Sequence, residues 1–308
     1  MSTAYISHEN CHLHDTGQGH PENASRLSAI EDKLLQSGVL DFLRNIHAPE
    51  VTRDQLLRVH SAGHLTNMDA LMPKQGFAKL DPDTIVSPNT MPAAMRAAGA
   101  VVSAVDLVMS GQVQNAFCNV RPPGHHAERS RAMGFCLFNN VAVGAAHALE
   151  TYDLSRIAIV DFDVHQGNGT EDICIGNDKI LYCSIFQHPF FPFTEPPKNT
   201  MNVISVPLDA SAKSTEFREA IKDYWIPAMM RFRPELIFIS AGFDAHRDDD
   251  MSYVSLVDAD FRWVTEQIVN VAEFSAQGRV VSVLEGGYEV NSLARCVELH
   301  LRVLMGLD

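Results

Sequence analysis

Short apolar runs rich in Val and Ile alternate with longer amphipathic segments along nearly the whole chain, and this alternation constrains the fold more than any other feature. The runs have the length and β-branching of buried strands, and the segments between them have helical spacing. We expect strands at 4–7, 116–119, 156–160, 180–186, 202–207, 235–240 and 279–284, and helices at 23–35, 56–71, 93–109, 139–150, 214–231, 258–276 and 291–305. Strands that alternate with helices form a parallel sheet covered on both faces, so we predict one α/β domain over residues 1–308.

Composition excludes some classes of protein. No stretch of about 20 residues is continuously apolar, and the N-terminus has no basic segment followed by an apolar one, so we expect neither a membrane span nor a signal peptide. The net charge of −14 argues against direct nucleic-acid binding and suits cationic or neutral partners, although solubility alone also explains it. The six cysteines are scattered, without a Cys-x-x-Cys pair, which predicts reduced thiols and a cytoplasmic location. No heptad repeat indicates an oligomer, so the oligomeric state stays open.

One predicted strand, 156–160, runs directly into three metal-binding residue types at alternate positions. These are Asp161, Asp163 and His165, and glycines follow at 167 and 169. A period of two places all three on one face, at the strand end where open α/β sheets bind ligands. Carboxylate and imidazole suit a divalent transition metal, above all zinc. The alternative is a turn in which the Asp side chains only bind backbone amides.

Other chemically active residues also follow predicted strands. His125 and His126 emerge from a turn with two prolines, Asp244 follows the strand at 235–240, and Tyr288 follows a Gly-Gly pair after the strand at 279–284. All would gather at one edge of a parallel sheet. Two carboxylates and one imidazole leave an open zinc site, a second imidazole can transfer protons, and a tyrosine can stabilise an oxyanion. These parts suit a metal-assisted amide hydrolase, although a tyrosine in this position can also be a core residue.

Several further residues have a structural interpretation beside a functional one. The region 11–22 reads as a loop at the rim of a site, and we expect its histidines not to bind metal. His60 and His64 are one helical turn apart but have no third ligand nearby, so we expect a structural role. Arg26 lies near the start of a helix, where a cation is unfavourable, so we expect it to have a partner elsewhere. The aromatic residues of 190–193 are either a packed lid or the wall of a pocket.

Six motifs, in order along most of the chain, resemble those of the histone deacetylase superfamily, especially the class II-like bacterial deacetylases related to acetylpolyamine amidohydrolases. They are His14-Asp15-Thr16-Gly17 with His20-Pro21-Glu22; Arg121-Pro122-Pro123-Gly124-His125-His126-Ala127; Gly134-Phe135-Cys136; Asp161-Phe162-Asp163-Val164-His165-Gln166-Gly167-Asn168-Gly169-Thr170; Ser240-Ala241-Gly242-Phe243-Asp244-Ala245-His246; and Glu285-Gly286-Gly287-Tyr288. Each motif alone is modestly specific, and together they are very specific.

The resemblance implies the arginase/deacetylase fold, an eight-stranded parallel sheet between helical layers, and it assigns catalytic roles. It makes His126 the general base and acid, and His125 its electrostatic partner. Asp161 would bond His125, Asn168 would orient His126, and Tyr288 would polarise the acetyl carbonyl.

The resemblance also implies two metal ions and a substrate channel. The zinc ligands would be Asp163, His165 and Asp244. A structural potassium ion would be bound by Asp161, Asp163, His165, Ser184 and Ile185. The channel for the aliphatic part of the substrate would be lined by Gly134, Phe135 and Phe190 or Phe191.

Three positions depart from patterns common in the superfamily. Asn168 stands where class I members have Asp, and a neutral partner should leave the pKa of His126 lower. Gln166 replaces a common His, which should affect hydrogen bonds around the metal site. Met251 occupies the rim position where acetylpolyamine-selective relatives can have Glu. That weakens a polyamine function, although five aspartates could supply the charge instead: Asp15, Asp83, Asp248, Asp249 and Asp250.

We therefore expect a zinc amidohydrolase acting on acetyl-lysine or another acyl-lysine in protein or peptide, with acetylpolyamines as the alternative substrate. An arginase-like ureohydrolase needs further bridging carboxylates, whereas Gln-Gly-Asn-Gly follows His165. A non-catalytic binding protein would be expected to lose a metal ligand or Tyr288. Acyl-chain length and the natural substrate are left open by the sequence.

Overall fold

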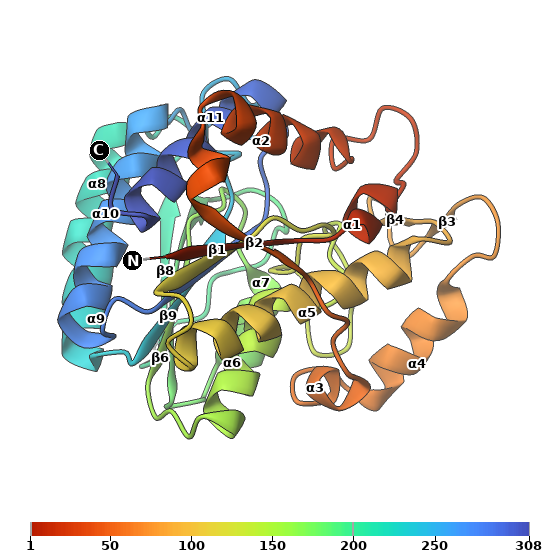
Figure 1. Cartoon of the computed structure of the whole chain (residues 1–308), viewed down its shortest axis with the longest axis horizontal. Coiled ribbons are helices and arrows are strands. Elements are labelled where there is room, and N and C mark those ends of the chain that lie inside the picture. Colours follow the sequence, from red (N-terminus) through yellow and green to blue (C-terminus); the bar gives the residue numbers. More distant parts are fainter. Residues whose placement is uncertain (1, 199, 308) are drawn as a thin grey trace.

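A computed structural model describes residues 2–198 and 200–307. Its centre is an eight-stranded, fully parallel sheet, visible edge-on in Figure 1. The strands, in spatial order, are β2 (Leu43–His47), β1 (Thr3–Ser7), β5 (Asn115–Cys118), β10 (Val280–Leu284), β9 (Leu236–Ala241), β6 (Ile157–Asp161), β7 (Ile180–Gln187) and β8 (Val203–Leu208). The predicted α/β fold with an eight-stranded parallel sheet is confirmed.

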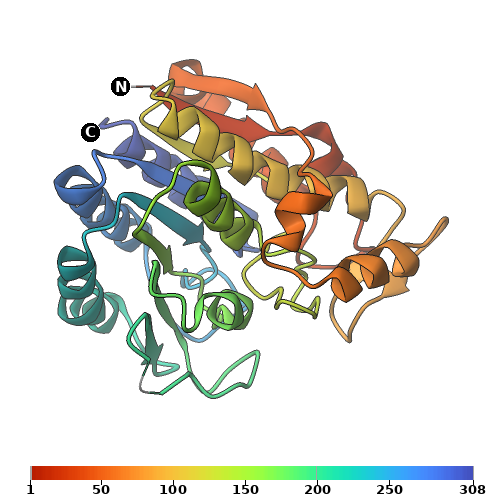
Figure 2. The same cartoon turned by 90° about the horizontal axis from the view of Figure 1, so that it is seen from below.

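Helices cover both faces of the sheet, as the two views in Figures 1 and 2 show. One layer contains α5 (Thr90–Met109), α6 (Asn140–Thr151) and α7 (Asn168–Cys174). The other contains α2 (Ser25–Gln36), α10 (Asp258–Ser275), α11 (Val290–Leu304) and a continuous helical segment formed by α8 (Ser214–Ala220), the π-helical η2 (Ile221–Trp225) and α9 (Ile226–Phe232). The central strands β5, β6, β9 and β10 are buried throughout because both of their faces are covered, which explains their continuous apolar runs.

Helix α5 is the one helix in the described part of the chain that is long and apolar enough to cross a membrane. It lies against α6 and against strands β1, β5 and β10, and most of its Ala and Val side chains are buried there. Burial in the core therefore accounts for its apolar composition.

The structure differs from the sequence predictions in its shorter elements. The expected loop at 11–22 begins inside α1 (Glu9–Leu13), and a small antiparallel pair, β3 (Ala78–Lys79) and β4 (Ile85–Val86), lies where neither a strand nor a helix was predicted. Edge strand β2, after the short 3₁₀ helix η1 (Val39–Phe42), was not predicted, because only Leu43 in it is buried and no alternation is visible.

The single helix predicted at 56–71 is wrong. The structure has α3 (Arg53–Leu57) and α4 (Ala62–Leu71), because the stretch contains two separate N-caps. Thr52 and Gln55 form a capping box at the first helix, and the Ser61 hydroxyl accepts the amide of His64 at the second. At the helix predicted for 139–150, Asn139 caps α6: its side chain accepts the amide of Ala142.

Candidate active site

The loops that follow four neighbouring strands meet at the carboxyl edge of the sheet. They follow β5, β10, β9 and β6, which lie side by side in that order. The strands end nearly in step, because Asp161 pairs with Ser240, and Leu284 with Ala241. A cavity of about 300 Å³ opens between these loops, and His125, His126, His165 and Tyr288 line it.

Most of the wall of this cavity is apolar. All five residues predicted for the substrate channel line it: Gly134, Phe135, Phe190, Phe191 and Met251. The Phe190 ring stacks on His165, with centroids 5.6 Å apart, and the Phe191 ring stands perpendicular to His126 at 5.1 Å. Phe190 and Phe191 therefore lie in the wall of this cavity.

Asp163, His165 and Asp244 converge as a group able to hold a metal ion, and His165 of this group lines the cavity. His165 Nδ1 lies 3.0 Å from Asp163 Oδ1 and 3.1 Å from Asp244 Oδ2. All three side chains are buried. Backbone amides fix the other carboxylate oxygens, since Gly286 donates to Asp163 (2.8 Å) and Val164 donates to Asp244 (3.0 Å). The donor set is two carboxylates and one imidazole, which is that of an open zinc site.

Two glycines make room for this group. A Cβ atom at Gly286 would lie 2.0 Å from Asp244 Oδ2, and one at Gly242 would lie 2.1 Å from Asp163 Oδ2. Any side chain at either position would displace a carboxylate. Gly242 of the Ser-Ala-Gly-Phe-Asp motif and Gly286 of the Glu-Gly-Gly-Tyr motif are therefore required by the close approach of the loop backbone to the metal-binding group.

The adjacent histidines have different partners. His125 Nδ1 lies 3.0 Å from Asp161 Oδ2, which also accepts the Tyr182 hydroxyl at 2.8 Å. His126 Nδ1 lies 2.8 Å from Asn168 Oδ1. The structure thus brings together the two pairs that the resemblance implied, one with a carboxylate and one with an amide.

These partners separate the pKa values of the two histidines. Burial alone would lower the pKa of His125, but the charges of Asp163 and Asp161 outweigh it and raise that pKa well above its usual value. Burial lowers the pKa of His126 well below its usual value, and the nearby His125 and His165 lower it further. His126 is therefore neutral near pH 7, which is the state that a general base requires.

Glu128, which the sequence interpretation missed, fixes the orientation of Asn168. The Asn168 amide nitrogen donates to Glu128 Oε1 at 2.7 Å. Because an ionised carboxylate only accepts hydrogen bonds, the Asn168 oxygen must face His126. His126 Nδ1 then carries the proton, and Nε2 remains unprotonated. Glu128 stands two positions after His126 in the sequence, but the sequence gives no sign that it contacts Asn168.

Arg26, for which a partner elsewhere was expected, and Asp249, whose role here the sequence interpretation missed, hold the segment that carries Tyr288. The Arg26 guanidinium donates to the carbonyls of Glu285 and Gly287, and lies 4.9 Å from the centroid of the Tyr288 ring. Asp249 accepts the amide of Tyr288 at 2.6 Å. Burial raises the pKa of the Tyr288 phenol well above its usual value, so the hydroxyl stays a donor at neutral pH. The partner expected for Arg26 is thus this segment, together with Glu22 at 3.2 Å.

Glu285 holds the turn before the two histidines. Its Oε2 accepts the amides of Gly124 at 2.7 Å and His125 at 3.1 Å, and its Oε1 accepts the Ser240 hydroxyl at 3.0 Å. Burial raises the pKa of Glu285 to about 7. Although the Glu-Gly-Gly-Tyr motif includes this residue, the sequence interpretation gave it no role.

Comparison with known proteins agrees with this arrangement. The histone deacetylase domain matches residues 20–304. The chain belongs to the histone deacetylase family. It is 35% identical over 297 residues to the histone deacetylase-like amidohydrolase of Pseudomonas aeruginosa, covering 94% of this chain and 78% of that protein. It is 33% identical over 327 residues to the polyamine deacetylase HDAC10 of Homo sapiens, covering 99% of this chain but only 48% of that protein. The crystal structure of the HDA15 HD domain superposes with a TM-score of 0.93 at 32% identity, over 99% of this chain and 90% of that one.

At the mouth of the cavity in this histone deacetylase family member, two of the five candidate rim carboxylates line the wall. These are Asp83 and Asp250. The other three have local partners instead: Asp15 accepts the amide of Gly17, Asp248 contacts Arg295, and Asp249 binds the Tyr288 segment. Met251 also lines the cavity, beside Asp250.

The histidines that were expected not to bind metal have other partners. His14 contacts Thr90 at 2.9 Å, His60 Nε2 accepts the amide of Asn139, and His64 contacts the Leu137 carbonyl. His20 lies against Phe135, which places it beside the cavity wall as expected for a rim loop.

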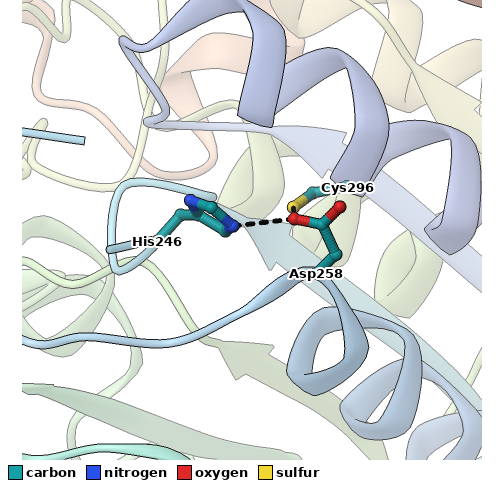
Figure 3. A group of neighbouring side chains, drawn as sticks. All are labelled: His246, Asp258 and Cys296. Carbon is teal, nitrogen blue, oxygen red and sulfur yellow. Dashed lines mark hydrogen bonds and ion pairs between the residues drawn. The ribbon is translucent and has the colours of Figure 1, made fainter. Parts of the chain in front are cut away.

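A second group of metal-binding residue types consists of His246, Asp258 and Cys296, shown in Figure 3. His246 Nε2 lies 2.7 Å from Asp258 Oδ1, and His246 Nδ1 accepts the amide of Asp248. An imidazole that accepts at Nδ1 carries its proton at Nε2, which leaves no lone pair there for a metal. The Arg295 guanidinium also binds the Asp258 carboxylate at 2.9 Å. We interpret this group as a hydrogen-bonded network that joins the loop after β9 to α10 and α11.

Proposed function

We propose that the protein is a zinc-dependent amidohydrolase that removes an acetyl or other acyl group from acylated lysine side chains, releasing the acid and the free amine. The observation that carries the proposal is a narrow apolar cavity whose inner end holds a metal-binding group, a neutral His126 and Tyr288. Apolar walls suit the methylene stem of a lysine, and the polar groups at the inner end suit the amide. Family membership supports a deacetylase of this kind.

The residues present fit a zinc ion. The carboxylates of Asp163 and Asp244 are buried next to each other. Without a cation, burial and the charge of Asp163 raise the pKa of Asp244 to about 6, so a bound cation would stabilise the pair. Asp163, His165 and Asp244 would hold the metal. Zinc, when bound, would polarise the amide carbonyl and acidify a water molecule.

In the proposed reaction the side chains of this chain position the reactants and move the protons. His126 Nε2, left free by the bond from Nδ1 to Asn168, would take the proton of the attacking water and pass it to the leaving amine. Charged His125, held by Asp161, would lower the energy of the developing negative charge nearby. The Tyr288 hydroxyl would donate a hydrogen bond to the oxyanion. Phe190 and Phe191 would exclude bulk water from the inner end.

We also propose a structural potassium ion beside the zinc, bound by Asp161, Asp163, His165, Ser184 and Ile185. Ser184 supports this: its hydroxyl is fully buried and has no hydrogen-bond partner among the described residues, while its strand position pairs with Asp161. A buried hydroxyl oxygen without a partner is costly, and a monovalent cation would satisfy it.

We propose a cytoplasmic location, supported by six cysteines that are all free thiols.

The substrate comparison is the first test of this proposal. Met251 at the cavity mouth favours acetyl-lysine, whereas Asp83, Asp250 and the similarity to a polyamine deacetylase support acetylpolyamines. We expect an acetyl-lysine peptide to be hydrolysed with a kcat/KM at least tenfold above that of acetylspermidine and acetylputrescine, with one zinc per chain by mass spectrometry. A tenfold preference for an acetylpolyamine would establish the alternative, and hydrolysis of none of them would contradict both.

The mouth carboxylate Asp83 gives a second, pH-dependent test. Burial and the nearby Asp81 together raise the pKa of Asp83 to about 6. Asp83 is therefore mostly protonated at pH 5 and ionised at pH 7, so attraction of a cationic substrate increases as the pH rises. Between pH 5 and 7 we expect kcat/KM for a peptide with Lys beside the acetyl-lysine to rise about fivefold more than for a matched neutral peptide, which corresponds to ~1 kcal/mol of attraction.

The ratio of the kcat/KM values for the two peptides does not depend on groups whose titration affects both peptides equally. Asp83→Asn should abolish the extra rise. Asp15→Asn is the matched control, because Asp15 is exposed and lies outside the cavity lining. If this ratio rises with pH in Asp83→Asn as it does in the wild-type protein, Asp83 has no role in substrate recognition.

A further inference from the structure

Gln166 stands directly after the metal ligand His165 and is almost fully buried, with 2% of its surface exposed. Its amide nitrogen donates to Glu171 Oε2 at 2.7 Å, and its amide oxygen accepts the hydroxyl of Thr194 at 3.1 Å. Glu171 is fixed in turn, because its second oxygen accepts the Ser205 hydroxyl of β8 at 2.6 Å. A carboxylate accepts hydrogen bonds, so the Gln166 nitrogen must face Glu171 and its oxygen must face Thr194.

Thr194 ends the segment that carries the cavity wall. We call residues 188–194 the aromatic loop; it contains Phe190 and Phe191. Within the described residues, the bond from Thr194 to Gln166 is the only side-chain hydrogen bond between this loop and the rest of the protein. One backbone bond, from His188 to Leu208, fixes its start. The end of the loop is therefore held by Gln166.

We propose that Gln166 is a positioning residue that sets the acyl specificity of the enzyme: through Thr194 it fixes the aromatic loop, and so the distance of Phe190 and Phe191 from the metal-binding group. This inference rests on the proposed amidohydrolase function. Gln166 does not touch the cavity itself, whereas Phe190 stacks on His165 and Phe191 contacts His126. Releasing the end of the loop lets both rings move outward, which loosens the fit for an acetyl group and admits a longer one.

The test uses one variant at each end of the hydrogen bond. Thr194→Val removes the hydroxyl at an exposed position, and Gln166→Met removes the amide with little change in shape. For an acetyl-lysine peptide we expect KM to rise about fivefold in either variant, as for the loss of one neutral hydrogen bond, with kcat within about twofold. The butyryl-to-acetyl ratio of kcat/KM should rise at least threefold. The double variant should match the single ones, because both act through the same contact.

Hydrogen–deuterium exchange of the 188–198 peptide provides a readout that does not depend on activity. Exchange should be faster in Thr194→Val and Gln166→Met and unchanged in the control Glu195→Gln, an exposed neighbour whose substitution leaves the Thr194–Gln166 bond intact. Unchanged exchange in both variants, or additive effects in the double variant, would overturn the inference. Failure of the wild-type enzyme to hydrolyse any acyl-lysine peptide would refute the proposed function, and loop exchange would still decide whether Gln166 positions the loop.

Discussion

Asp163→Ala is expected to retain less than a tenth of the zinc bound by the wild-type protein. The substitution leaves two protein ligands, His165 and Asp244, where an open zinc site needs three. Asp163 also accepts the amide of Gly286 and the amide of His165, so the loop geometry that presents the remaining ligands is lost as well. Turnover should fall by about three orders of magnitude or more, because the proposed zinc would supply several kcal/mol of transition-state stabilisation.

Metal content measured by mass spectrometry on the purified variant checks this expectation directly. Asp258→Asn is the matched control, because Asp258 belongs to the network with His246 and Cys296 that we interpret as free of metal. It should keep a full complement of zinc. A full complement of zinc in Asp163→Ala would refute the ligand assignment. Loss of zinc in Asp258→Asn alone would show that the ion binds the group of Asp258 instead.

The centre of the site was predictable because its residues directly follow neighbouring strands and belong to motifs that resemble those of a known family. Asp161 is the last residue of β6, Asp163 and His165 lie in the loop that follows instead of in the strand, and parallel strands bring their carboxyl ends to one edge. The structure accordingly brings Asp244 within 3.1 Å of His165, although 79 residues separate them. Contacts between residues that follow different strands can therefore be predicted from the sequence when the strands are known to be parallel neighbours.

The residues that orient this centre were not predictable in the same way. Glu128, Asp249 and Glu285 act through hydrogen bonds between irregular loops, and no period or spacing in the sequence indicates such contacts. The missed elements have a related cause. Strands β3 and β4 have two residues each, too few for a pattern, and the break between α3 and α4 depends on which of several polar residues acts as the cap.

Tyr288→Phe tests the other half of the proposed mechanism, because it removes one oxygen atom and leaves the metal ligands intact. The ring itself is held by its contacts with Phe135 and the Arg26 guanidinium, and the backbone by Asp249, none of which involves the hydroxyl. The fold and the zinc content should therefore be unchanged. Loss of one preorganised donor to an oxyanion lowers kcat by about 10² to 10³, or roughly 2.7–4 kcal/mol.

The kinetic pattern separates this role from a structural one. A hydroxyl that contacts the substrate mainly in the transition state lowers kcat and kcat/KM together and leaves KM nearly unchanged. A tyrosine that only packs the cavity wall would instead change KM, and the Phe ring would preserve most of that packing. Because the phenol pKa is raised, the hydroxyl is a donor across the neutral range, so the loss in Tyr288→Phe should be the same at pH 6 and pH 8. Near-normal kcat in a variant with full zinc would remove Tyr288 from the mechanism and leave the oxyanion to the metal and His125.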